Sequence, residues 1–79
     1  MNNKKIVDNW AKLEAYKTSR NIHRLRLKRK FTLKGLAYNA KIKKSSLKKL
    51  ETNCLWIRIN TFNKVAMALG VELYVLFET

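Results

Sequence analysis

Apolar side chains recur along this chain at intervals of three and four residues, which is the spacing of one face of an α-helix. The recurrences divide the chain into five segments that we expect to be helical, at residues 4–17, 19–30, 32–40, 43–52 and 59–69. A sixth apolar run, at residues 72–77, predicts a last helical turn or an edge strand, since β-branched and aromatic residues favour strands. The pattern therefore predicts an all-α chain.

Residue types that begin or end helices stand at these boundaries. Thr18 or Ser19 can cap the second segment and Thr32 the third, because a hydroxyl oxygen accepts a hydrogen bond from a first-turn N–H group. Asn53 and Gly70 follow the fourth and fifth segments, and both residue types tolerate the left-handed backbone that ends many helices. The segments are therefore expected to be separate helices.

The boundaries predict two parts of unequal size. Residues 1–18 form an N-terminal extension with one helix, and residues 19–79 form one compact domain of five helices. A chain of 79 residues can build one hydrophobic core but not a catalytic domain with a second module. The apolar positions expected in the core are Ile22, Leu25, Leu33, Leu36, Ala37, Ala40, Leu47, Leu50, Ile59, Phe62, Val65, Ala66, Leu69, Leu73, Leu76 and Phe77.

The charge of the chain predicts that this helical domain binds an acidic partner. The chain has 18 Lys and Arg against 5 Asp and Glu, a net charge of +13 and a pI near 10.3. Residues 15–50 contain thirteen of the basic residues and no acid. A field of this sign attracts DNA, RNA or an anionic membrane surface. The positive charge is more concentrated in residues 15–50 than solubility alone would require.

The sequence lacks the residues that several classes of function require. Cys54 is alone, which excludes a disulfide framework and a Cys-based zinc site. His23 has no Asp, Cys or second His beside it in the sequence, so we expect a surface or boundary histidine and not a catalytic one. Without paired carboxylates, a His or Cys cluster or a Gly-rich phosphate loop, we expect no enzyme, metal, cofactor or small-molecule substrate.

The chain also lacks the patterns of membrane and exported proteins. No run approaches the roughly 18 to 20 apolar residues of a membrane span. The basic start is interrupted at Asp8 after two apolar residues, so it cannot serve as the core of a signal peptide. We therefore expect a cytoplasmic protein.

Two short helices joined by a tight connection form the arrangement in which one helix lies against the phosphate backbone and the next enters the major groove. Residues 32–53, TLKGLAYNAKIKKSSLKKLETN, resemble the Cro/C1-type (XRE-like) helix-turn-helix family. With the flanking helices the resemblance covers about 57 of 79 residues, 21–77, without a gap. It implies a lambda-repressor-like five-helix fold and a bacterial or phage transcription regulator. The residues that carry it are Leu36, Ala37, Ile42, Leu47, Leu50 and Glu51, then Ile59, Thr61, Phe62, Val65, Ala66, Ala68–Val71, Leu76 and Phe77.

The resemblance also implies roles for individual side chains. The base-reading positions would be Lys44, Ser45 and Lys49, and Lys or Ser can address base edges in the major groove. Glu51 would form a structural ion pair with Arg26, because the family pairs this acid with an arginine of its first domain helix. The positions implied for contact with the DNA backbone are Lys34, Lys43, Lys48, Thr52 and Arg58.

Four positions depart from the family pattern. Leu33 stands where the family usually has Gln, and Ile57 where it often has Pro. Lys41 stands at the usual turn glycine, which costs on the order of 1 kcal/mol if the angle is left-handed; otherwise Asn39 or a shifted turn takes that angle. Lys43 replaces the capping Ser or Thr, and a DNA phosphate there would relieve its conflict with the helix dipole.

Unusually apolar positions predict a partner surface, most simply that of a homodimer. Trp56 and Ile57 fall in a loop where the family often has polar residues, and Trp10 lies on the N-terminal helix. A two-fold dimer would supply a second reading helix and two half-sites about one DNA turn apart. Periodicity leaves open whether the N-terminal helix makes this contact or covers the core of its own subunit.

Three functions fit these features. The first is a sequence-specific regulator that binds double-stranded DNA, either a repressor or a controller protein of a mobile element, acting by operator occupation. The second is an antitoxin-like module that neutralises a partner protein, with DNA binding secondary. The third, an RNA-associated basic protein, ranks last because double-stranded RNA hides its major groove and no stacking platform is evident from the sequence.

Overall fold

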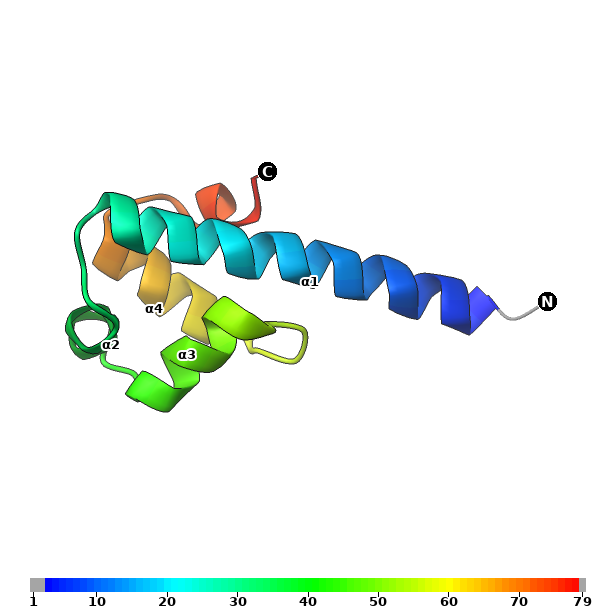
Figure 1. Ribbon diagram of the computed structural model, residues 1–79, viewed down its shortest axis with the longest axis horizontal. Helices are drawn as coiled ribbons and strands as arrows, with labels where there is room; N and C mark the ends of the chain where they lie inside the picture. The colour runs from blue at the N-terminus through cyan, green and yellow to red at the C-terminus, as the bar shows by residue number, and fades with distance from the viewer. Residues whose placement is uncertain (1–2, 79) are drawn as a thin grey trace.

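The computed structural model describes the backbone of residues 3–78 and the side chains of residues 11–78. Its elements in chain order are α1 (Asn3–Lys28), α2 (Leu33–Ala40), α3 (Lys44–Thr52), α4 (Ile59–Leu69) and the 3-10 helix η1 (Leu73–Phe77). The described residues contain no strand, so this part of the chain is all-α, as predicted. Figure 1 shows the shorter helices gathered around the C-terminal half of α1, while its N-terminal half extends away from them.

The first helix is continuous, and the predicted break near residue 18 is wrong. α1 has 26 residues, so the N-terminal extension and the first helix of the domain are one element. Thr18 and Ser19 are buried inside it, and the Ser19 hydroxyl accepts a hydrogen bond of 3.1 Å from the backbone N–H of Cys54. Because the surrounding residues include no Gly or Pro, the helix has no reason to stop. The Ser19 hydroxyl, which the sequence pattern predicts as a helix cap, thus binds the backbone of a distant loop instead.

One hydrophobic core lies where α1 meets the four shorter elements. Most predicted core residues are buried, and Ile22, Leu36, Leu47, Leu50 and Val65 are fully enclosed. Burial of this apolar area is the main force that holds helices too short to be stable alone. The buried apolar residues are Ala15, Ile22, Leu25, Leu36, Ala37, Ala40, Leu47, Leu50, Cys54, Phe62, Val65, Ala66, Leu69 and Leu76.

Two predicted core positions are wrong. Ile59 is 58% exposed, because it is the first residue of α4 and the helix reaches the core only at Phe62. Phe77 is 42% exposed, although its ring lies 5.2 Å from that of Phe62. Leu33 and Leu73 are half-buried against the core. Apolar residues at the ends of the predicted helices therefore lie at the periphery of the core, where they are only partly buried.

The C-terminal run is a 3-10 helix and not an edge strand, and a buried amide holds it against α1. The side-chain nitrogen of Asn21 donates to the carbonyls of Val75 at 2.8 Å and Leu76 at 3.0 Å. Asn21 is 6% exposed, so it supplies hydrogen-bond partners to carbonyls that lie partly or wholly away from water. The sequence pattern had not singled out this contact.

Left-handed residues end three of the helices. Asn53 ends α3 with an extended backbone, φ −154, so the left-handed angle expected there is wrong. Gly70 has φ 74 at the end of α4, as predicted, and Lys41 has φ 58 at the end of α2, so neither Asn39 nor a shifted turn takes this angle. The N–H groups of Lys41 and Ile42 donate to carbonyls of the last turn of α2. Lys30, with φ 61, follows α1 in the same way. Lysines therefore take the left-handed angle in the turns after α1 and α2.

Replacing Lys41 with glycine should stabilise the protein. A left-handed lysine is strained by its Cβ, and glycine removes this strain at the expense of a more flexible unfolded chain, so the net gain is about 0.5 to 1 kcal/mol. The free energy of unfolding in urea measures it. Lys41→Ala removes the same charge but keeps the Cβ, so it should give no gain. Equal stabilisation by both variants would assign the effect to charge and contradict the backbone explanation.

Candidate nucleic-acid interface

The α2–turn–α3 unit presents α3 to solvent. The Thr32 hydroxyl caps α2 by accepting a hydrogen bond of 2.9 Å from the N–H of Gly35, as predicted. Lys43 is the N-cap of α3 and makes no side-chain cap hydrogen bond. The first-turn N–H groups of α3 are therefore without a side-chain acceptor, and their partial positive charge favours an anion at this end of the helix.

One face of α3 is basic and exposed. Leu47 and Leu50 are fully buried and fix the opposite face against the core. Side chains three and four residues apart lie on one side of a helix, which places the outward positions in two neighbouring rows. We call this surface the basic face of α3; its residues, all exposed, are Lys44, Ser45, Lys48, Lys49 and Thr52.

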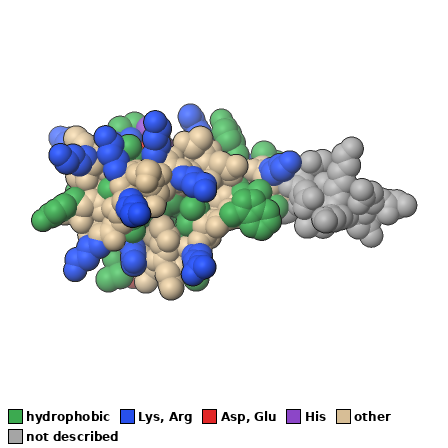
Figure 2. Space-filling model, turned by 90° about the horizontal axis from the view of Figure 1, so that it is seen from below, with side chains coloured by type: hydrophobic (Ala, Val, Ile, Leu, Met, Phe, Trp, Pro, Cys, Tyr) green, Lys and Arg blue, Asp and Glu red, His purple; other side chains and the backbone are tan. Residues whose placement is uncertain are grey.

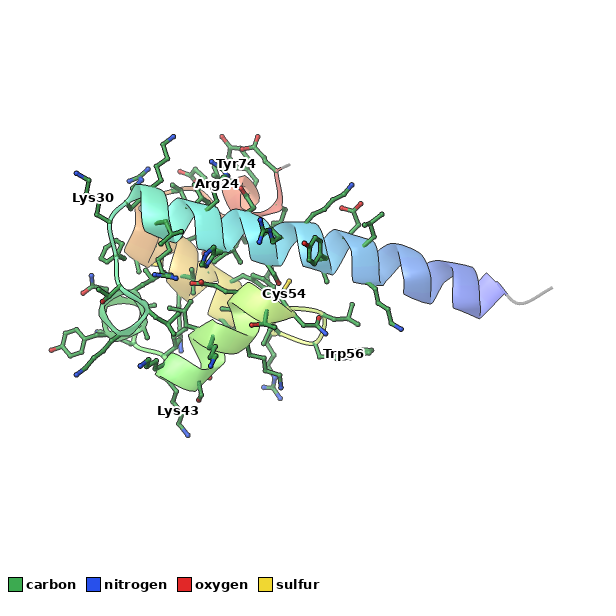
Figure 3. The ribbon with its side chains drawn as sticks, viewed as in Figure 1. Arg24, Lys30, Lys43, Cys54, Trp56 and Tyr74 are labelled. Atoms are coloured by element: carbon green, nitrogen blue, oxygen red, sulfur yellow. The ribbon has the colours of Figure 1, made fainter. Side chains whose placement is uncertain are left out.

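Lys and Arg side chains also surround the basic face. Figure 2 views the molecule from the side of α2 and α3, and blue side chains are spread over that surface. Lys34, in the first turn of α2, and Arg58, the N-cap of α4, are both exposed. Lys43 lies at the end of α3 that is remote from Trp56 (Figure 3). The residues implied for contact with DNA thus include the whole exposed side of α3 and the starts of its two neighbours.

The single acid of α3 is turned away from the basic face. The Glu51 side chain is 7% exposed, and its Oε2 accepts a hydrogen bond of 2.7 Å from Arg26 Nε. The ion pair implied by the family resemblance is therefore present in the structure. Because the carboxylate points inward to α1, no acid interrupts the outward lysines of α3.

Two further contacts extend this ion pair into a network. Arg26 Nη1 donates to the carbonyl of Phe31 at 2.9 Å, which ties the connection between α1 and α2 to the same guanidinium. His23 Nδ1 lies 2.6 Å from Glu51 Oε1, and the His23 side chain is 42% exposed. His23 is thus a boundary residue, as expected. Its carboxylate partner could not be found from its sequence neighbours because the two residues are 28 positions apart.

The Thr52 side chain is already engaged within its helix. Its hydroxyl donates to the carbonyl of Lys48 at 2.8 Å. The proton is therefore used, and only the oxygen lone pairs remain for another partner. If Thr52 contacts the DNA backbone as predicted, donation of its hydroxyl proton to a phosphate would require this internal bond to break.

Trp56 and Ile57, neighbours in the loop after α3, differ in exposure. Trp56 is 87% exposed, which agrees with an outward aromatic position. Ile57 is half-buried and packs against the core, so it exposes less apolar surface than its loop position predicts. Trp10 lies outside the residues whose side chains the structure describes. Among these three residues, the structure thus shows a largely exposed side chain at Trp56.

A concavity joins Trp56 to the basic face of α3. Its volume is about 360 Å³, and its walls come from α3 and from the loop that follows. This shared surface could not be predicted, because a loop of uncertain geometry separates the aromatic residue from the helix in sequence. The residues that line it are Ser45, Lys48, Lys49, Thr52, Asn53 and Trp56.

The described residues form neither a metal site nor a membrane span. Among the side chains that the structure describes, no group of three or more His, Cys, Asp and Glu could hold a metal ion. None of the described helices has both the length and the apolar character needed to cross a membrane. No protein-family model, curated protein sequence or solved structure matches this chain.

Neutralising Glu51 should strongly destabilise the fold. Glu51→Gln leaves the Arg26 guanidinium, 11% exposed, without its counter-charge, and breaking such a buried pair costs roughly 3 to 5 kcal/mol. Urea denaturation measures the change. Glu14→Gln is the matched control, since its pair with Lys17 spans 3.8 Å between side chains more than 40% exposed and should contribute less than about 1 kcal/mol. Equal effects of the two changes would contradict the locking role of Glu51.

Proposed function

We propose that this protein is a sequence-specific, double-stranded-DNA-binding transcription regulator of the helix-turn-helix type, acting in the cytoplasm. Its fold would be the lambda-repressor-like one, with α1 serving as both N-terminal extension and first domain helix. It would act as a repressor or as a controller protein of a mobile element, by occupying an operator. The observation that carries the proposal is the uninterrupted basic face of α3, held outward by a buried apolar face and a buried carboxylate.

The charge and dipole of α3 support this proposal. Lys44, Ser45 and Lys49 would reach base edges from a helix in the major groove, while Lys48 would lie nearer the phosphates. The uncapped start of α3 at Lys43 would meet a phosphate, which offsets the unfavourable position of a cation beside the helix dipole. Lys34 and Arg58 would add phosphate contacts on either side. Exposed cations are thus available for both backbone contact and base reading.

A homodimer would complete the DNA-binding unit. One reading helix covers only part of a major-groove turn, and a two-fold axis would place a second copy about 34 Å along the DNA. The projecting half of α1 is the part of the molecule best placed to reach a partner without covering α3 (Figure 1). We therefore place the dimer contact on α1.

A second candidate function, an antitoxin-like protein-interaction module, is favoured by the outer surface of α1. Leu13, Tyr16 and Leu27 are each about half exposed there. Tyr16 and Leu27 line a broad concavity of about 780 Å³ together with Lys17, Arg20, Asn21, His23 and Arg24. Exposed apolar side chains framed by charge are typical of protein-binding surfaces. In this function α1 would hold the partner protein, and DNA binding would be secondary.

Removing two lysines from the basic face should abolish sequence preference. We expect the wild type to bind the DNA upstream of its own gene more tightly than a random duplex. Lys44→Ala combined with Lys49→Ala should remove that difference and lower the salt slope by about 0.9 for each phosphate that the protein no longer neutralises. Fluorescence anisotropy with labelled duplexes at several salt concentrations measures both quantities.

A control variant separates position from charge. Lys12→Ala combined with Lys64→Ala removes the same charge from exposed helical positions outside α2 and α3, so preference for the upstream DNA should persist. Equal, steeply salt-dependent binding of the wild type to both duplexes would contradict sequence-specific reading. No binding to any duplex at moderate salt would overturn the regulator and favour the protein-interaction module.

A further inference from the structure

The loop between α3 and α4 is anchored to α1 at Cys54. The Cys54 backbone N–H donates to Ser19 Oγ at 3.1 Å, and its thiol donates to the carbonyl of Ala15 at 3.2 Å. Cys54 is 5% exposed, so both bonds lie away from water. Buried hydrogen bonds of this kind are costly to break without a replacement partner. The start of the loop is therefore held in one position relative to the long helix.

The residues around Trp56 restrict the loop further. Asn53 Oδ1 accepts a hydrogen bond of 3.1 Å from the N–H of Leu55, and the N–H of Ile57 donates to the carbonyl of Cys54 at 3.2 Å. Leu55 and Ile57 are half-buried and pack against the core. Trp56 thus lies between two anchored neighbours while its own side chain is 87% exposed. The fold presents an indole in solvent on a constrained backbone.

The surroundings of this indole are cationic and polar. Trp56 lines the 360 Å³ concavity with Lys48 and Lys49, and none of the described side chains that line it is acidic. Figure 3 shows Trp56 at the outer end of the loop, directed away from the buried Cys54. A second copy of this chain would bring like-charged lysines against each other here, which opposes self-association through this surface. The two lysines favour an anion, and the exposed indole favours a ligand with a flat ring that can stack on it.

We propose that this concavity is a binding subsite for an unpaired nucleotide. The base would stack on the indole of Trp56, and its phosphate would lie between Lys48 and Lys49. The amide of Asn53 and the hydroxyl of Ser45 are the polar groups available to the edge of the base. Aromatic side chains beside lysines are the usual means by which proteins hold unpaired bases without strong sequence preference. The subsite shares Ser45, Lys48 and Lys49 with the proposed duplex-reading face, and Trp56 is the aromatic side chain that it adds.

The interior of an intact duplex cannot use the subsite in this way. Its internal base faces are covered by neighbouring base pairs, so away from the ends only base edges, sugars and phosphates would reach Trp56. A single-stranded overhang offers an uncovered base face together with its phosphate. The protein should therefore distinguish a duplex with an overhang from the same duplex with blunt ends.

The test compares three DNA probes of one duplex sequence: blunt ends, a three-thymidine overhang, and an overhang of three abasic residues. The thymidine probe should bind about tenfold more tightly than the abasic probe, the size expected for stacking of a single base. Both overhangs carry the same phosphates, so the comparison isolates the base. In a Trp10→Phe background Trp56 is the only tryptophan, and the thymidine probe alone should quench its fluorescence strongly.

Protein variants assign the effect to one side chain. Trp56→Ala should bind the thymidine and abasic probes equally, whereas Trp56→Phe should keep most of the difference because it keeps a ring. Tyr74→Ala is the matched control, since Tyr74 is 64% exposed and does not line the concavity; it should behave like the wild type. Circular dichroism confirms that each variant is folded.

Equal affinity of the wild type for the thymidine and abasic probes would overturn the subsite, as would a difference that survives Trp56→Ala. These results are separable from the proposed function. Sequence-preferring binding to the blunt duplex without any gain from thymidine would leave the regulator standing and reject the subsite. A Trp56-dependent gain from thymidine with no preference among blunt duplexes would support the subsite and reject the regulator.

Discussion

The buried ion pair between Arg26 and Glu51 is the interaction on which the arrangement of the helices depends. It joins α1 to α3 at 2.7 Å, and the same guanidinium holds the connection to α2 through the carbonyl of Phe31. It also removes the only acid of α3 from the solvent-facing side. One contact therefore orients α3 and leaves its outer face without an acid, so the positive charge of this surface follows from packing in the interior.

α1 provides hydrogen-bond partners for α3, for the loop that follows α3 and for η1. Ser19 holds the loop after α3, Asn21 holds η1, and Arg26 holds α3. These polar residues are buried within one helix and satisfy groups that would otherwise lie unpaired away from water. A break of α1 near residue 18 would separate these anchors from the carbonyl of Ala15, which accepts a hydrogen bond from the Cys54 thiol. Continuity of the helix thus contributes to placing the loop that carries the indole of Trp56.

Predictions from the sequence succeeded where a local rule applied and failed where a distant partner intervened. The apolar spacing of α2, α3 and α4 located those helices closely, because side chains three or four residues apart share a face in any helix. Ser19 satisfied the local rule for a cap, yet its hydroxyl binds Cys54, 35 residues away. Ile57 satisfied the rule for an exposed loop position, yet it packs against the core.

The sequence by itself determined an all-α chain with one core, a strong positive charge, and lysines in register on one side of α3. These properties depend on residue type and on spacing within one segment. Only the tertiary structure decided that α1 is continuous, that Lys41 takes the left-handed turn, and that Trp56 shares a concavity with Lys48 and Lys49. Each of these is settled by contacts between residues far apart in the chain, or by the backbone path that such contacts impose.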